Sequence, residues 1–271
     1  MDLLKSYKLG NIRLSNRVVS TNTCIEDCTQ GASLANKTQA GLIITEGIAP
    51  YTAENPSGAS RLYSEAHIEK WEKVTNAVHN RNGKIFLDIL HSVDKNQKQL
   101  ILTQSKEDFN LLVDKYVVAA KNSIYAGFDG IEINCGEESF LSQFLDPSLN
   151  KRTDEYGGGS DKDRCKLVLD IVKACIEEVG SSRVGIRISR LGKKDATNID
   201  KLTKTQEHLI TQLNNLRTLF LLIDNATDTP LKLNAVLRNF FDNTIILTTS
   251  NKNSEILAEI PDSNFNLIAT K

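Results

Sequence analysis

The chain has 271 residues, of which 40% are hydrophobic and 25% are charged, and its formal net charge at pH 7 is −1. These values are ordinary for a soluble globular protein and exclude the strongly basic surface that nucleic-acid binding requires. No stretch approaches the roughly 20 apolar residues of a membrane span, and the first residues lack the apolar core of a secretory signal. The cysteines are odd in number and irregularly spaced, so we expect reduced thiols in a cytoplasmic protein.

A small hairpin and a series of strands are predicted next, in chain order. The hairpin covers Tyr7–Ser15 and turns at the pair Gly10 and Asn11. Short runs rich in Val and Ile then alternate with amphipathic stretches, and their nearly continuous apolar character suits a parallel sheet buried on both faces. The runs are Arg17–Ser20, Leu42–Thr45, Ile85–Leu90, Gly130–Ile133, Val184–Ile188, Leu219–Ile223, Thr244–Thr248 and Asn266–Ala269. We therefore predict one α/β domain over residues 1–271, a closed (β/α)8 barrel at 16–271 that follows the N-terminal hairpin at 1–15.

Three helices are predicted together with their ends. They cover Ser64–Arg81, Ser105–Ala126 and Asp161–Val179, and each stops close to a glycine, the residue that most often follows a helix. The second begins with a serine that has Asp108 three residues on, an arrangement that resembles a capping box. Helices between the strands are consistent with the parallel barrel.

Two regions of the predicted barrel are short. Few residues separate His91 from the helix that begins at Ser105, and the chain stops at Lys271, directly after the eighth predicted strand. We therefore expect a short cap region and no C-terminal extension. The outer faces of the eighth and first strands, with Leu267 and Val18 as candidates, would then lack a covering helix. We expect a second copy of the chain, a homo-oligomer, or neighbouring helices to cover them.

Several motifs occur in a fixed order along the chain. The most specific is the run Asn-Lys-Arg-Thr-Asp-Glu-Tyr-Gly-Gly at Asn150–Gly158, which follows Phe140–Leu145 and precedes Arg183–Ser189. Two further matches lie at Leu9–Val19 and Gly41–Gly47. In this order the motifs resemble the old yellow enzyme family of flavin-dependent oxidoreductases. The resemblance implies a (β/α)8 barrel that binds FMN, takes electrons from NAD(P)H and reduces an activated alkene or a related small molecule.

The resemblance places several residues beside the flavin ring. Thr23 and Cys24 fall on the run after the first strand, where a family Thr or Cys hydrogen-bonds the ring; the alternative is that Cys24 is simply a small buried residue. Gly47 would let the backbone approach a flat ring. Asp88 replaces a family glutamine, so it could accept from the ring N3–H, but its negative charge would disfavour the reduced, anionic ring.

Arg187 matches the family arginine that lies near flavin N1 and supports the reduced ring. The alternative for an arginine inside a barrel strand is a structural ion pair with Glu132 or Asp224. At the phosphate end, the glycines that the family uses after the seventh and eighth strands are absent. Thr249 and Lys271 stand there instead, so we expect FMN to bind weakly or to have been lost.

The predicted catalytic positions follow the fourth strand and depart from the family pattern. Asn134 can still donate one hydrogen bond to a substrate carbonyl, whereas Glu137 would repel an oxyanion unless protonated. Ser139 occupies the place of the proton-donating tyrosine and is too weak an acid to replace it. The alternative is a polar loop without a catalytic task.

Three hypotheses follow for the function. The first is an FMN-dependent oxidoreductase of the old yellow enzyme type with an altered active site. The second is a flavin-independent barrel, an isomerase or cyclase, that moves protons with carboxylates such as Asp88 and Glu137. The third is a non-catalytic relative that binds a ligand. The four histidines show no metal-ligand spacing, so a metal site is not predicted, apart from a carboxylate-only magnesium site that the sequence leaves open.

Overall fold

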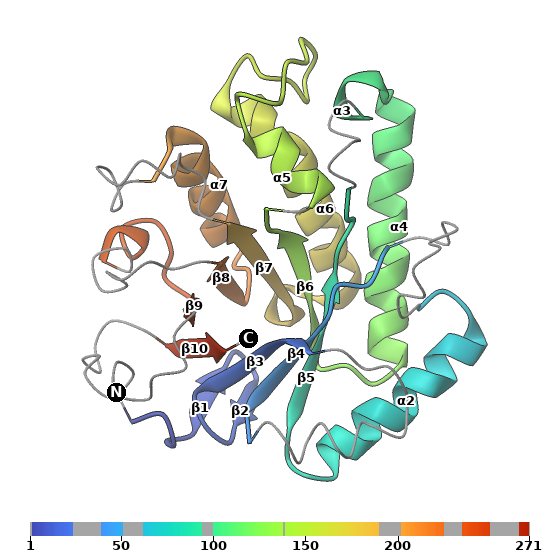
Figure 1. The fold of residues 1–271 in the computed structure, drawn as a ribbon, viewed down its shortest axis with the longest axis vertical. Helices are drawn as coiled ribbons and strands as arrows, with labels where there is room; N and C mark the ends of the chain where they lie inside the picture. The colour runs from blue at the N-terminus through green and yellow to red at the C-terminus, as the bar shows by residue number, and fades with distance from the viewer. Residues whose placement is uncertain are drawn as a thin grey trace.

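A closed barrel of eight parallel strands forms the centre of the molecule in the computed structural model (Figure 1). The structure describes residues 2–23, 39–50, 62–93, 100–137, 139–189, 202–224, 235–249 and 266–270. Within them, the barrel strands are β3 (Val18–Thr23), β4 (Leu42–Thr45), β5 (Lys84–Ile89), β6 (Gly130–Cys135), β7 (Val184–Ser189), β8 (Phe220–Asp224), β9 (Thr244–Thr249) and β10 (Leu267–Thr270). They pair in sequence order, and β10 closes the ring against β3. The predicted (β/α)8 barrel is therefore confirmed, and each predicted run overlaps one strand.

The N-terminal hairpin is also confirmed. Its strands β1 (Tyr7–Leu9) and β2 (Ile12–Leu14) pair antiparallel, and Gly10 in the turn has φ 55°. That left-handed conformation suits glycine, which has no Cβ to clash. Leu9 and Leu14 are fully buried and pack against apolar side chains of the barrel strands, so the hairpin closes one end of the barrel.

The described helices lie on the side of the barrel formed by β5 to β8 (Figure 1). Those described are α2 (Glu65–His79), α3 (Leu100–Thr103), α4 (Lys106–Tyr125), α5 (Phe140–Leu145), α6 (Asp161–Val179), the 3-10 turn η2 (Ser181–Arg183) and α7 (Lys204–Asn215). The predicted capping box is present: the Ser105 side chain accepts from the Asp108 N–H, and the Asp108 side chain accepts from the Ser105 N–H. None of these helices is both long and apolar enough to cross a membrane.

The barrel interior has an apolar lower part and a charged upper part. Side chains two residues apart on a strand face the same side of a sheet. On β5, Phe86 belongs to the apolar interior cluster, and Asp88 follows it two residues later. The same step leads on β8 from Leu222 to Asp224. The apolar cluster consists of Leu9, Leu14, Val19, Leu42, Ile44, Phe86, Leu219, Phe220, Leu222, Ile246, Leu267 and Ala269.

One prediction about the outer surface is wrong. Leu267 was expected on the outer face of the eighth strand, but it is fully buried in the interior cluster. The next residue, Ile268, packs in the other cluster, between strands and helices. Because side chains alternate along a strand, an error of one residue exchanges the inner and outer faces. Leu267 therefore needs no partner surface to cover it.

Candidate active site

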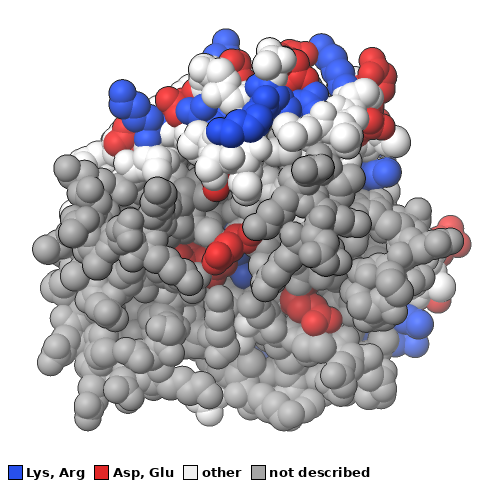
Figure 2. Space-filling view, turned by 45° about the horizontal axis from the view of Figure 1, so that its top comes forward, with Lys and Arg blue, Asp and Glu red and all other residues white. Residues whose placement is uncertain are grey.

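Polar and charged side chains converge at the carboxyl ends of β5 to β8, where enzymes with this fold carry their active sites. Asp88 pairs in register with Glu132, and Asn134 pairs with Arg187. All four residues are at least 95% buried, and Asp224, the last residue of β8, is 8% exposed. Figure 2 brings the upper end of the barrel forward, and acidic side chains with a basic one beside them are visible in the middle of the view.

Arg187 forms ion pairs inside the barrel. Its Nε donates to Glu132 Oε1 at 2.8 Å, and its terminal nitrogen lies 3.8 Å from Asp224 Oδ2. Both partners named in the sequence-based alternative are thus in contact with it. Its role beside a flavin ring stays a prediction, because the ion pairs account for its burial without a ligand.

Asn134 is engaged within the protein at both ends of its amide. Its Nδ2 donates to Asp88 Oδ2 at 2.8 Å, and its Oδ1 accepts from the Gly136 N–H at 2.8 Å. The amide therefore fixes the orientation of the Asp88 carboxylate. A substrate carbonyl would have to use the second N–H of the same amide.

Two buried carboxylate oxygens, Asp88 Oδ1 and Glu132 Oε2, accept no hydrogen bond from the residues that the structure describes. Burial raises the pKa of Asp88 to about 6, although the Arg187 charge and the Asn134 hydrogen bond oppose the rise. Burial also raises the pKa of Glu132, to about 8, with Arg187 opposing and the carboxylates of Asp88 and Asp224 adding to the effect. Burial therefore favours the protonated form of both carboxyls.

The other two predicted catalytic residues do not join this cluster. Ser139 is fully buried at the N-cap of α5, where its Oγ accepts from the Ser142 N–H at 3.0 Å. Glu137 is exposed at the turn after β6. Of the three residues predicted after the fourth strand, only Asn134 contacts the charged interior.

The structure describes only some of the predicted cofactor residues in full. Gly47 follows β4, and a Cβ added there would lie 2.5 Å from the Leu90 side chain. The backbone at Gly47 therefore packs closely against Leu90. Thr23 and Thr249 end β3 and β9, and their side chains are not described. Cys24 and Lys271 lie outside the described residues. The roles of these residues at a flavin therefore stay predictions.

Sequence reasoning did not name Glu132, Asp224 or Ser189 as site residues. Glu132 faces the same side of its strand as Asn134, and Ser189 faces the same side as Arg187, because the members of each pair are two residues apart. Asp224 stands in the same relation to Leu222. A period-two count from Asn134 and Arg187 would have found the first and the last of them.

The Asn150–Gly158 motif makes structural contacts with its neighbours. Asn150 Nδ2 donates to the carbonyls of Phe144 and Tyr156 at 3.0 and 2.9 Å. One terminal nitrogen of Arg152 donates to the carbonyls of Ile101 and Gln104 at 2.6 and 2.8 Å. These bonds tie the loop between α5 and α6 to its neighbours.

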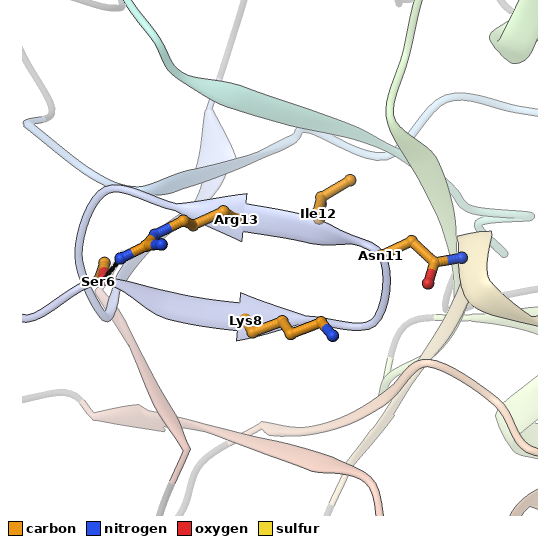
Figure 3. Close-up of a pocket in the computed structure, with 5 residues that line it drawn as sticks. All are labelled: Ser6, Lys8, Asn11, Ile12 and Arg13. Atoms are coloured by element: carbon orange, nitrogen blue, oxygen red, sulfur yellow. Dashed lines mark hydrogen bonds between the residues drawn. The ribbon is translucent and has the colours of Figure 1, made fainter.

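A hollow of about 470 Å³ lies on the hairpin, away from the charged cluster (Figure 3). It is lined by Ser6, Lys8, Asn11, Ile12 and Arg13. None of these is a predicted site residue, and the hairpin closes the opposite end of the barrel from the carboxyl ends of the strands. We do not assign the active site to it.

Comparison with known proteins gives consistent matches. The profile of the NADH:flavin oxidoreductase / NADH oxidase family matches residues 2–104 and 92–225. The chain is 32% identical to 12-oxophytodienoate reductase 1 of Oryza sativa subsp. japonica over 228 residues, 69% of this chain and 58% of that protein. It is 30% identical to a 12-oxophytodienoate reductase-like protein of Solanum lycopersicum over 280 residues, 90% and 77% of the two chains. It is 31% identical to a probable flavin mononucleotide-dependent alkene reductase of Leishmania infantum over 264 residues, 80% and 71% of the two.

Solved structures show the same fold at low sequence identity. Morphinone reductase in complex with tetrahydroNAD superposes with a TM-score of 0.83 at 22% identity, over 99% of this chain and 86% of that one. The old yellow enzyme from Trypanosoma cruzi gives 0.82 at 24% identity, over 99% and 88%. The chain spans less than two thirds of the rice relative.

Proposed function

Because the chain belongs to the NADH:flavin oxidoreductase / NADH oxidase family, that of the old yellow enzymes, we propose that it is an FMN-dependent oxidoreductase with an altered active site. Its substrate would be an activated alkene or a related small molecule, and its electron donor NAD(P)H. The family match over residues 2–225 carries this proposal. The relative named as an alkene reductase supports the reaction class.

The residues at the carboxyl ends of the strands fit a flavin ring in part. Bound FMN would supply hydride transfer between the nicotinamide and the substrate. Asp88 Oδ1, a buried acceptor that no described residue donates to, fits a ring N–H. Arg187 would bring positive charge to the ring, but Glu132 and Asp224 already contact it. We propose that the chain binds the neutral oxidised ring better than the anionic reduced ring, because the Asp88 carboxylate, where ionised, would repel a negative charge on the ring.

The groups that would act on the substrate are also altered. The Ser139 Oγ is occupied as a helix cap, and a serine hydroxyl is a weak acid. The Asn134 amide is shared with Asp88 and Gly136. We propose that proton delivery is poor and that simple enones are reduced about 10²–10⁴-fold more slowly than by a relative with a tyrosine donor.

Two measurements test this function. The purified protein is titrated with FMN while flavin fluorescence is followed, and NAD(P)H-dependent reduction of cyclohexenone is then assayed. We expect saturable FMN binding and slow turnover. Asp88→Gln restores an amide that donates and accepts, so it should tighten binding, whereas Asp170→Asn, which changes a partly exposed acid paired with Lys166, should not. Absence of saturable binding up to the millimolar range would contradict the proposal.

A second candidate is favoured by the position of the Asp88 carboxyl, which is buried at the carboxyl end of β5 and accepts from Asn134. Asp88 has a pKa raised to about 6 by burial, and a carboxyl that titrates near neutrality is suited to general acid–base chemistry. A flavin-independent proton transfer through Asp88 would follow, without Glu137, which is exposed. Solvent-deuterium exchange into a cyclic ketone, catalysed by protein free of flavin and lost in Asp88→Asn, would select this candidate.

A further inference from the structure

The N-terminal hairpin has an apolar inner face and a basic outer face. Side chains alternate along its strands, so Leu9 and Leu14 are fully buried against the barrel interior, whereas Lys8 and Arg13 are exposed. Residues 1–17 carry four cationic side chains and one acidic one, although the whole chain has a net charge of −1. The hairpin is therefore a basic segment of a slightly acidic chain.

The hollow on the hairpin is lined almost entirely by hydrogen-bond donors. It has a volume of about 470 Å³, which lies within the range of roughly 300–1,000 Å³ for sites that hold small molecules. Two of its lining side chains, Lys8 and Arg13, are cationic, and Ser6 and Asn11 add a hydroxyl and an amide. Ile12 is the apolar member of the lining (Figure 3). A lining of this kind, which contains no carboxylate, suits an anion.

The two cations are held close together by the hairpin itself. Lys8 and Arg13 are direct partners across the antiparallel strands, and like charges in that position are destabilising. A terminal nitrogen of Arg13 donates to Ser6 Oγ at 2.9 Å, which fixes the guanidinium beside the hollow. The ion pairs formed among the described residues include neither cation. A bound anion would therefore offset a repulsion that the fold leaves in place.

The directions of the two side chains indicate the shape of the anion. The Lys8 amine extends toward the turn of the hairpin, and the Arg13 guanidinium extends the other way, toward Ser6 (Figure 3). One small ion would contact one of these charges, whereas two linked anionic groups would contact both. Phosphate oxygens suit both partners, because a guanidinium donates parallel N–H bonds to them and an ammonium binds them as a point charge.

We propose that the hollow on the hairpin is a binding site for a small molecule that carries a diphosphate group. One phosphate contacts Lys8 and the other contacts Arg13, with Asn11 as a neutral donor and Ile12 as a wall for the organic part of the ligand. The site lies at the end of the barrel opposite the charged cluster. The inference goes beyond the proposed function and does not depend on it.

Two inorganic anions test whether linked phosphates are recognised. The purified full chain is titrated calorimetrically with pyrophosphate and with phosphate, in magnesium-free buffer, both without added FMN and with FMN at saturation. We expect one pyrophosphate per chain, bound at least about tenfold more tightly than phosphate, because the second group adds a hydrogen bond to a charged side chain. The affinity for pyrophosphate should be the same with and without FMN.

Variants and amide resonances locate the binding. Lys8→Gln and Arg13→Gln should each reduce the affinity for pyrophosphate by about tenfold, to that of phosphate for the parent. Lys5→Gln is the matched control, because Lys5 belongs to the same segment but does not line the hollow and lies 3.9 Å from Asp2. It should change the affinity by less than about twofold. In the isotopically labelled parent, the amide resonances of residues 6–13 should shift as pyrophosphate is added.

Three results would overturn the site: no saturable pyrophosphate binding, equal affinity for the two anions, or an equal loss of affinity in Lys5→Gln and Arg13→Gln. The last would mean that diffuse surface charge attracts the anion. Pyrophosphate that FMN displaces, with unchanged affinity in the Lys8 and Arg13 variants, would be bound at the barrel mouth and would also overturn the site. Binding at the hairpin in a chain that does not bind FMN would support the site and contradict the proposed function.

Discussion

Replacing Asp88 by asparagine should stabilise the protein at neutral and alkaline pH. Burial raises the pKa of this carboxyl from 3.8 to about 6, so the folded protein holds the proton more tightly than the unfolded chain. Folding therefore carries a penalty that is absent below about pH 4, grows as the pH rises, and is complete above about pH 6. At roughly 1.36 kcal/mol per pH unit, this penalty is about 3 kcal/mol.

Asparagine has the shape of the protonated acid and carries no charge to bury. Its side-chain oxygen can still accept from Asn134 Nδ2, which donates to Asp88 Oδ2 at 2.8 Å in the unaltered protein. We expect the free energy of unfolding of Asp88→Asn at pH 8 to exceed that of the parent by up to about 3 kcal/mol. The difference should shrink as the pH falls below 6 and vanish near pH 4.

Urea unfolding followed by circular dichroism at several pH values between 4 and 8 measures this difference. Asp170→Asn is the matched control, because the same change at a surface pair should shift stability by less than about 1 kcal/mol at every pH. A variant that is less stable than the parent by the same amount at pH 5 and pH 8 would refute the reasoning. It would mean that attraction to Arg187 outweighs the cost of burying the charge.

Three further variants test other contacts by the same unfolding measurement. Arg187→Met removes the cation that contacts Glu132 and Asp224 and should cost about 3–5 kcal/mol; an unchanged midpoint would show that these ion pairs contribute nothing. Asn150→Ala removes the donor to two buried carbonyls and should cost about 2–4 kcal/mol, with loosening of the α5–α6 loop visible in amide hydrogen exchange. Gly185→Ala would place a Cβ 2.2 Å from the Phe220 ring, so we expect a loss of about 1–3 kcal/mol or more, and a neutral outcome would contradict the interior packing.

The order and type of the barrel elements could be predicted from sequence because they depend on local patterns. Apolar runs mark the strands, and the Ser105 and Asp108 pair marks the start of α4. The pattern has a resolution of about one residue at strand ends, and that is why Leu267 was assigned to the wrong face.

The contacts of the candidate site could not be predicted in the same way. Register across neighbouring strands, which the closed barrel sets, brings Asp88 beside Glu132 and Asn134 beside Arg187. The sequence predicted that Asn134 donates to a substrate, whereas in the folded protein its Nδ2 donates to Asp88. Likewise, the serine at position 139 could be read as a failed proton donor, but its use as a helix cap depends on where α5 begins.

The separation of the interior into an apolar floor and a charged upper part has an evolutionary consequence. The floor, sealed by Leu9 and Leu14 of the hairpin, supplies burial that does not depend on which polar residues stand above it. Polar side chains at the carboxyl ends of the strands can therefore be exchanged singly, each at a cost of a few kcal/mol, without dismantling the fold. Chemistry can drift in such a barrel while its architecture stays recognisable, so likeness of the whole chain to its relatives says little about the reaction that the upper layer now favours.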